Sequence, residues 1–382
     1  MSFRESKTTD ILFDLLKLFL FFFDKFFPKD DKILLFPLKD KKDYKDNLRF
    51  CYDLTVDYSE FNCILLCYSK ESFADKKFIS FYSFRGILYW LRARFIFIHH
   101  GTDDIPYFDS IDFRRRKVIN LWHGIPLKGI GFKDFKANKS KLKKEFKLYT
   151  GVICSSKLDQ LAMQASFGLP NEKIWITGLP RNDSLIQEAD SLPNDLLKQS
   201  EWIQEKVGDK KMVLYMPTWR KTSSNDIFSK DESTKLNQSL KDNNAVLVVK
   251  NHPNTKPFNF RELDAIDISN SPCNEVSVLL RNADILVTDY SSVWVDYLLL
   301  DRPIVSYCYD FDAYRKDPGF IYDYENIFPE KLNLTFDAFL LNLEKSLEKS
   351  IISDKQNRLK QLFHENPDGK NSERIYAKLV GN

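Results

Sequence analysis

The chain has 382 residues, of which 43% are hydrophobic and 14% aromatic, and its net charge is only +3. This length suits two ordinary globular cores, and 12 glycines and 15 prolines are too few for a fibrous or low-complexity protein. The six cysteines are scattered, mostly inside apolar runs, and no zinc-site spacing is present, so we expect a reduced, cytoplasmic compartment.

The first predicted element is a helix over Ile11–Pro28, "ILFDLLKLFLFFFDKFFP", that ends before its proline. Its Leu and Phe residues are interrupted by four charges, Asp14, Lys17, Asp24 and Lys25. The uninterrupted apolar run is too short to span a bilayer, and no small-residue cleavage site marks a signal peptide. The charges fit one polar stripe. Two interpretations remain open: a helix in the plane of a membrane interface, and a helix packed on the domain that follows.

The rest of the chain alternates short apolar runs with helical patterns, which is typical of parallel sheets covered by helices. In the first half the predicted strands are 32–37, 62–68, 94–99, 117–122, 152–155 and 174–177. In the second half they are 212–216, 245–250, 265–268, 284–288 and 303–307. The polar, helix-like stretch 182–209 connects the two series, and the sequence from about residue 334 onward is helical by periodicity.

We therefore predict an α/β protein of two facing, doubly wound, Rossmann-like domains with a cleft between them. The predicted boundaries are 1–30 for the N-terminal helix, 31–190 for the first domain, 191–210 for the connection, 211–333 for the second domain and 334–382 for the C-terminal helices. Ligands of such folds bind at the carboxyl ends of the strands, so the strand exits are where functional residues are expected.

The charge is concentrated in one basic segment, Arg114–Lys147, which holds twelve Lys and Arg residues against two acids, Asp134 and Glu145. Such a run is often only a solvated helix face. Because this one surrounds His123, which follows the strand "VINLW", an anionic partner is the stronger interpretation: phosphate, acidic lipid or nucleic acid.

Polar residues follow six predicted strands. They are His123, Ser155 and Ser156, Gly178, Thr218 and Arg220, His252, and finally Asp289 with Ser291 and Ser292. Each alone has an ordinary explanation, because strand-terminal Ser or Asp residues commonly cap helices and His-Gly or His-Pro commonly marks a turn. Their convergence on one cleft indicates a site.

The segment Thr288–Pro303, "TDYSSVWVDYLLLDRP", is chemically the most informative. A turn at Asp289–Ser292 leads into a helix over Val293–Leu300, so free N–H groups and two hydroxyls meet at a helix N-terminus and favour an anion. No glycine-rich P-loop accompanies it. Asp296, one turn further on, is placed to accept hydroxyls of a ribose or polyol, unless it is simply a solvated helix residue.

Six motifs in order carry a resemblance to a known family. They are "INLWHGIPLKGIG", "TGLPRND", "LYMPTWR", "VKNHP", "ADILVTDYSSVWVDYLLLDRPIVSY" and "GFIYDYE". With these, the chain resembles the CDP-glycerol glycerophosphotransferase family, the teichoic-acid and capsule polyol-phosphate transferases. One departure is Ile125, where the family often has a threonine, so no hydroxyl is present at that position.

The resemblance implies a GT-B-like fold with an acceptor domain at 31–190 and a CDP-donor domain at 211–333. It implies transfer of a polyol phosphate, glycerol phosphate first, to a lipid-linked or polymeric acceptor with release of CMP, at the cytoplasmic face of the membrane. CDP-ribitol as donor is one alternative, and a GT-B glycosyltransferase using another nucleotide sugar is a second. A non-enzymatic nucleic-acid or membrane-binding module would explain the basic segment but not the histidines and serines at strand exits.

The candidate site residues follow from the chemistry together with the resemblance. We expect His123 as the general base, with Asp289 as a second catalytic candidate. Residues expected to bind the donor diphosphate are His252, Ser291, Ser292 and Arg220, and those expected to bind its ribose or polyol are Asp296 and Thr218. An acceptor or membrane patch is expected at Arg114, Arg115, Arg116 and Lys128. No metal, cofactor or nucleic-acid partner is expected.

Overall fold

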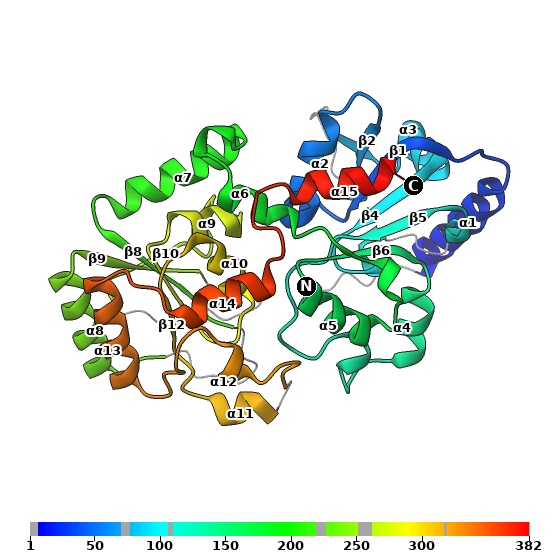
Figure 1. The fold of residues 1–382 in the computed structure, drawn as a ribbon. Coiled ribbons are helices and arrows are strands. Elements are labelled where there is room, and N and C mark those ends of the chain that lie inside the picture. Colours follow the sequence, from blue (N-terminus) through cyan, green and yellow to red (C-terminus); the bar gives the residue numbers. More distant parts are fainter. Residues whose placement is uncertain are drawn as a thin grey trace.

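The chain folds around two fully parallel β-sheets that lie side by side (Figure 1). The computed structural model describes residues 7–69, 77–105, 110–218, 227–250, 262–316 and 319–381. The α/β class and the two series of parallel strands are confirmed.

The first sheet has the strand order β3-β2-β1-β4-β5-β6-β7. Its strands are β1 Asp30–Leu38, β2 Asn62–Cys67, β3 Phe78–Ser80, β4 Ala93–Ile98, β5 Lys117–Asn120, β6 Tyr149–Cys154 and β7 Ile174–Ile176. Every strand predicted in this half is present; β3 was not predicted, because three half-buried residues give no apolar run to recognise.

The second sheet has the strand order β10-β9-β8-β11-β12. Its strands are β8 Lys211–Met216, β9 Ala245–Val249, β10 Ala265–Asp267, β11 Ile285–Thr288 and β12 Ile304–Ser306, all as predicted. In both sheets the strand order reverses beside the first strand of the series, between β1 and β4 and between β8 and β11. Those reversals are the points at which doubly wound sheets leave room for a ligand.

The helices cover both faces of both sheets. Their bounds are α1 Lys7–Asp24, α2 Asp46–Val56, α3 Phe84–Arg92, α4 Lys139–Phe146, α5 Lys157–Phe167, α6 Asp183–Ile186, α7 Asn194–Val207, α8 Lys230–Asp242, α9 Val276–Asn282, α10 Val293–Tyr297, α11 Phe311–Lys316, α12 Tyr324–Ile327, α13 Phe336–Glu348, α14 Asp354–Phe363 and α15 Asn371–Val380. Among the described residues, no helix is both long enough and apolar enough to cross a bilayer.

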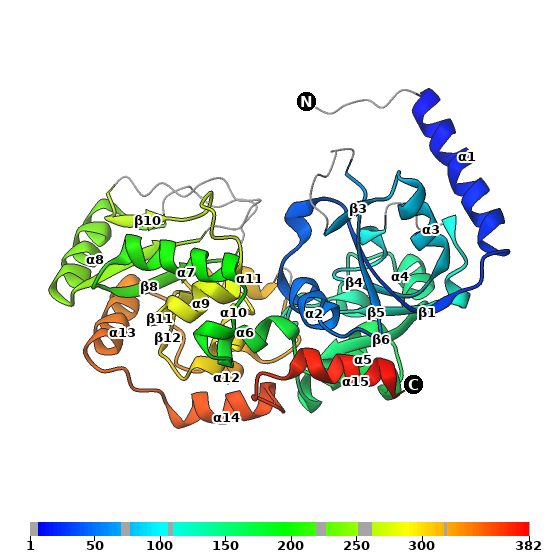
Figure 2. The ribbon, with the colours of Figure 1, turned by 90° about the horizontal axis from the view of Figure 1, so that it is seen from above.

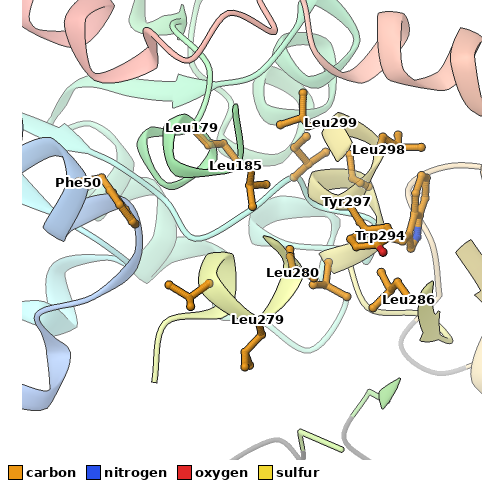
Figure 3. Close-up of a cluster of buried hydrophobic side chains, with 14 of the residues drawn as sticks. Phe50, Leu179, Leu185, Leu279, Leu280, Leu286, Trp294, Tyr297, Leu298 and Leu299 are labelled. Carbon is orange, nitrogen blue, oxygen red and sulfur yellow. The ribbon is translucent and has the colours of Figure 1, made fainter. Parts of the chain in front are cut away.

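One continuous apolar cluster joins the two sheets. Figure 3 shows part of it, where Leu179 and Leu185 from the end of the first series face Leu280, Tyr297 and Leu298 from the second. Two further clusters cover the outer faces, one packed by α1, α3 and α5 and the other by α8 and α13. Shared burial of this kind holds the two sheets together as a unit, because removal of apolar surface from water is the main stabilising contribution to packing.

The C-terminal helices do not stay on the second sheet. Helix α13 packs there, but α15 returns to the first sheet and lies against α2 (Figures 1 and 2). Tyr376 of α15 stacks on Tyr58 with ring centroids 3.9 Å apart, and the Asp183 carboxylate accepts from the backbone N–H groups of Asn371 and Ser372 at 2.8 and 2.9 Å. The chain therefore crosses between the sheets a second time, although the predicted domain boundaries themselves stay a prediction.

Helix α1 is present as predicted and stands at the side of the first sheet that is far from the second (Figures 1 and 2). One face is packed: Leu20 is fully buried and Leu16 is half-buried against the outer core. The opposite face is exposed and apolar. Leu15, Leu18, Phe19 and Phe22, together with Phe26 just after the helix ends at Asp24, are each between 55% and 68% exposed. Those five residues fall at helical spacing, so they form one stripe.

The end of α1 is held by buried charges. The Asp24 carboxylate pairs with the Arg116 guanidinium at 2.5 Å and with the Lys29 ammonium at 2.8 Å. Burial opposes ionisation of Asp24, but its hydrogen bonds with Arg116 and Lys29 prevail and lower its pKa. Arg116, expected on an acceptor or membrane patch, is thus inside the protein, and that expectation was wrong. A charge run in the sequence does not reveal which of its members has a buried partner.

Candidate functional site

The His123 loop leaves β5 through an unusual backbone. Trp122 adopts a left-handed conformation with φ +47°, and Gly124 has φ +145°, which residues other than glycine rarely adopt. The Asn47 side chain secures the loop by donating to the carbonyl oxygens of Leu121 and Trp122 at 3.0 and 2.9 Å. Backbone of this kind persists only where its surroundings fix it, and it gathers at functional sites.

This loop meets the serine turn of the second sheet. A Cβ added to Gly124 would lie 2.9 Å from the Arg181 guanidinium and 3.3 Å from the Ser292 hydroxyl oxygen. His123 was predicted on the opposite domain from the anion site, with the two meeting only when both domains come together. The structure places Gly124 of the His123 loop close to Ser292, at the carboxyl ends of β5 and β11.

Arg181 connects the two sheets beneath this contact. Its guanidinium pairs with Asp46 at 3.1 Å and with Asp296 at 2.5 Å, and it also donates to the carbonyl oxygen of His123 at 2.9 Å. Sequence reasoning quoted the motif that contains Arg181 but gave this residue no role. Asp46, from the start of α2, carried no sequence signal at all, because only the fold brings it here.

Asp296 does not have the environment predicted for a sugar ligand. The residue is 2% exposed, and its two carboxylate oxygens accept from Arg181 and from the Asn182 side-chain amide at 2.5 and 3.1 Å. Both oxygens are therefore used inside the protein. The helix position was predicted correctly, but the sequence did not show that the inner side of α10 faces Arg181, so we no longer assign Asp296 to the ribose or polyol.

Three of the five histidines gather at this end of the first sheet. The ring centroid of His123 lies 4.9 Å from that of His100 and 6.3 Å from that of His99. Asp104 accepts from the backbone N–H groups of His99 and His100 at 2.8 and 2.6 Å. The sequence analysis missed this pair, although "FIFIHH" ends a predicted strand in the same manner as the His123 segment.

Electrostatics keep the His123 imidazole neutral. Solvent still reaches this residue, but desolvation by the surrounding protein, followed by the nearby His100 and His99, lowers its pKa. A neutral imidazole at pH 7 is the form that accepts a proton. Burial opposes ionisation of Asp46, yet Arg181 and His99 prevail and lower the pKa of this carboxylate.

The turn after β11 is organised by Asp289. This carboxylate is buried and accepts from the backbone N–H groups of Thr218 and Tyr290 at 2.8 and 2.5 Å. The Tyr324 hydroxyl donates to the backbone carbonyl oxygen of Asp289. Asp289 thus fastens the exit of β8 to the exit of β11. The geometry favours this structural role over the catalytic one that we considered, and it places Thr218, predicted at the ribose, mostly buried beside it.

The two serines lie at the start of the predicted helix. Ser291 and Ser292 are half-buried, and α10 with the 3₁₀ turn Leu298–Leu300 spans the predicted range. The one cap-like contact described is long, with the Ser291 hydroxyl 3.5 Å from the backbone nitrogen of Val293. Arg220 and His252, the other predicted diphosphate ligands, lie outside the described residues.

Other strand-exit residues have ordinary structural roles. Ser156 caps α5 by accepting from the backbone N–H of Asp159, as the capping interpretation predicts. Ser155 lies 3.1 Å from Nδ1 of His364, whose Nε2 lies 2.7 Å from the carbonyl oxygen of Val295. Burial lowers the pKa of His364, so this ring is a neutral link between α5, α10 and α14.

The predicted basic patch is not one surface. Arg114 is 84% exposed on its side chain and pairs with Asp112, whereas Arg115 donates to the carbonyl oxygen of Asp24 at 2.7 Å. Lys128 lies elsewhere, with its ammonium 5.5 Å from the ring centroid of Tyr314. No cluster of His, Cys, Asp or Glu able to hold a metal ion occurs among the residues that the structure describes.

Glu275 makes the free energy of unfolding depend on pH. Its carboxylate is buried, accepts from the backbone N–H of Asp46 at 3.1 Å, and has its pKa raised from 4.5 to about 7 by burial and by the Asp46 charge. The folded state therefore binds this proton more tightly than the unfolded state, so stability falls as pH rises from 4.5 towards 7.

We predict that Glu275→Gln removes this loss, which is worth about 3 kcal/mol. The free energy of unfolding in urea, measured at pH 5 and pH 8, should fall less with pH in the variant than in the wild type. The exposed Glu330→Gln variant is the control. Parallel pH profiles for Glu275→Gln and the wild type would show that Glu275 does not cause the pH dependence of stability.

Comparison with known proteins supplies a family. The model of the CDP-Glycerol:Poly(glycerophosphate) glycerophosphotransferase family matches residues 19–381. The teichoic acid poly(ribitol-phosphate) polymerase of Bacillus spizizenii is 28% identical, over 95% of this chain and 59% of its own length. The teichoic acid glycerol-phosphate transferase of Staphylococcus aureus is 27% identical, over 75% of this chain and 77% of its own length.

The chain spans only 59% and 52% of the first two curated relatives that it matches, both ribitol-phosphate polymerases. Among solved structures, the wall teichoic acid polymerase TagF superposes with a TM-score of 0.75 at 24% identity, covering 97% of this chain and 92% of that one. At that identity the structural likeness is a likeness of fold.

Proposed function

We propose that this chain, which belongs to the CDP-glycerol:poly(glycerophosphate) glycerophosphotransferase family, transfers a polyol phosphate from a CDP-polyol to an acceptor hydroxyl. The observation that carries the proposal is the proximity of Gly124, in the His123 loop, to Ser292 of the serine turn. A neutral imidazole and an anion-binding turn at adjacent strand exits are what such a transfer needs in one place. The acceptor is a lipid-linked or growing teichoic-acid-type or capsule polymer.

The reaction follows from these groups. An acceptor oxygen attacks the phosphorus that bears the polyol, its proton passes to His123, and the bond from that phosphorus to the oxygen of CMP breaks. The half-buried Ser291 and Ser292 bind the diphosphate, together with Arg220 and His252, and offset the charge that CMP carries away. A GT-B-like cleft between the two sheets is the proposed location of the donor, bound on the second sheet.

The test is an assay of the released nucleotide. The full chain would be incubated with CDP-glycerol, CDP-ribitol or UDP-N-acetylglucosamine and a polyol-phosphate acceptor, and CMP and UDP would be separated chromatographically. CMP from CDP-glycerol is expected first, with CDP-ribitol as the alternative because the relatives' names divide between the two polyols. Release of UDP alone would replace the proposal by a glycosyltransferase.

We further propose peripheral attachment to an anionic membrane through the exposed stripe of α1 and nearby basic residues. Such a stripe inserts its apolar side chains at the interface while Lys and Arg bind acidic headgroups. Deleting the helix is a poor test, because loss of Asp24 leaves the buried Arg116 without its partner. Substitution of exposed residues avoids this problem.

Phe19→Ser with Phe22→Ser is expected to lower the affinity for phosphatidylglycerol vesicles, measured by sedimentation, by about tenfold or more. The reason is that burying each phenylalanine ring stabilises the bound state by roughly 1.5 to 3 kcal/mol. What remains should be removed more easily by salt. The control is Leu341→Ser with Ile351→Ser, which are 52% and 72% exposed near the second sheet. Binding that ignores the phenylalanine changes, or a dimer that these changes dissociate, would contradict membrane insertion.

A further inference from the structure

A cavity of about 740 Å³ lies between α1 and α4. Helix α1 lines it with Lys17 and Phe21, and α4 lines it with Lys141 and Lys144. Two features that are separate in the sequence, the aromatic helix and the basic segment, therefore share one cavity. Its volume is in the range of small-molecule binding sites.

The polar side of the cavity carries four cations, Lys17, Arg114, Lys141 and Lys144. It also carries three carboxylates, each engaged within the protein. Asp112 holds Arg114 at 2.8 Å, Asp103 lies 3.6 Å from Lys141, and Glu145 accepts from the Tyr149 hydroxyl and the Thr102 N–H at 2.6 and 3.0 Å. Lys144 is exposed and forms no ion pair within the described part of the chain.

The other side of the cavity is apolar. Its walls include Ile105, Ile111, Phe113 and Leu148, of which the first three are almost fully buried residues of the outer core. The part of this lining that solvent reaches is Phe21, which is 36% exposed, and the half-buried Leu148. A free phosphate would leave these two side chains in water, whereas a ligand with an acyl or isoprenoid chain would cover them. The same helix carries the exposed stripe on another of its faces, so α1 links the cavity to the proposed membrane-facing surface.

We infer that this cavity binds the phosphate headgroup of an anionic membrane lipid. The phosphate would lie between Lys144 and Lys141, replacing the exposed pair of Lys141 with Asp103 at 3.6 Å, and the first carbons of the chain would lie against Phe21 and Leu148. The inference rests on the membrane attachment proposed above, but on neither the donor nor the reaction. It differs from general attraction to a charged surface in that particular lysines would recognise one headgroup. Phosphate esters bound by two ammonium groups gain strong, charge-assisted hydrogen bonds.

The test uses water-soluble lipids, so that vesicle attachment does not intervene. Calorimetry on the full chain would compare dihexanoyl-phosphatidylglycerol below its micelle concentration, dihexanoyl-phosphatidylcholine and inorganic phosphate. Lys141→Glu with Lys144→Glu is expected to weaken phosphatidylglycerol binding by at least about tenfold. The control pair Lys331→Glu with Lys349→Glu, exposed residues near the second sheet, should leave it unchanged.

Each other outcome overturns the inference in its own way. Equal binding of phosphatidylcholine would leave an apolar cavity without headgroup recognition, and equal binding of inorganic phosphate would leave a phosphate site that does not need a lipid. Unchanged phosphatidylglycerol binding in Lys141→Glu with Lys144→Glu would show that the lipid does not bind in this cavity. Because CMP release from the donor is measured separately with a lipid-free acceptor, failure here is distinguishable from failure of the proposed reaction.

Discussion

Replacing His123 with alanine is expected to lower the rate of polyol-phosphate transfer by about 10² to 10⁴-fold, which is the contribution usual for a general base. Donor binding should change little, because the proposed role of the imidazole is on the acceptor hydroxyl, whereas the proposed diphosphate ligands Ser291 and Ser292 follow a strand of the second sheet. The measurement is the initial rate of CMP release at saturating donor, together with the dissociation constant of CDP-glycerol by calorimetry.

Two contrasting variants make this result specific. His100→Ala removes a ring 4.9 Å away, centroid to centroid, and should reduce the rate far less. Ser291→Ala with Ser292→Ala should instead weaken donor binding, since charge-assisted hydrogen bonds contribute about 1.5 to 3 kcal/mol each. If His100→Ala is the inactive variant while His123→Ala keeps its rate within about tenfold of wild type, the base is His100.

The pH profile adds an independent readout of His123. A base works in its neutral form, so the rate falls as the pH drops through the pKa of that group. Desolvation and the neighbouring His100 and His99 lower the pKa of His123, so the acid limb attributable to it should lie below the ordinary value of 6.5. The profile would contradict this assignment if its acid limb were centred above 6.5.

The parts of this structure that depend on local pattern could be predicted from sequence. Apolar runs of four to seven residues between helical stretches located eleven of the twelve described strands, and the Ser-rich exit of β11 located the start of α10. The His123 segment was identified because it is one of six polar strand exits and lies within the basic segment Arg114–Lys147. Local periodicity is enough for such inferences.

The errors concern partners that are distant in sequence. In the sequence, Arg116 is one more member of a basic run. In the structure its side chain is buried in an ion pair with Asp24, 92 residues earlier. In the sequence, Asp296 is a polar residue on a helix expected to face the cleft. In the structure its carboxylate accepts a hydrogen bond from Arg181, 115 residues earlier. A single sequence shows which residues carry charge; which of them are paired and buried is decided by tertiary packing.

The Arg181 network is the place where such distant pairing should have the largest effect on stability. Arg181→Ala would leave the Asp296 carboxylate, 2% exposed, without its cation. Removing one partner of a buried ion pair commonly costs about 3 to 5 kcal/mol, because the remaining charge is neither solvated nor paired. We expect a loss of this size in the free energy of unfolding measured by urea titration.

Arg92→Ala is the matched control, because Arg92 pairs with Asp30 at 3.1 Å but both side chains are partly exposed, at 41% and 31%. Exposed pairs contribute about 0 to 1 kcal/mol. Adding Asp296→Asn to Arg181→Ala should recover part of the lost stability, because the buried Asp296 charge is then gone while Asp46 still lacks the guanidinium. Transfer activity should not recover with it, since the carbonyl oxygen of His123 still lacks the guanidinium that donates to it at 2.9 Å. If Arg181→Ala lowers the free energy of unfolding no more than Arg92→Ala does, the network does not hold the two sheets together. If the double variant with Asp296→Asn is also fully active, Arg181 does not position the His123 loop.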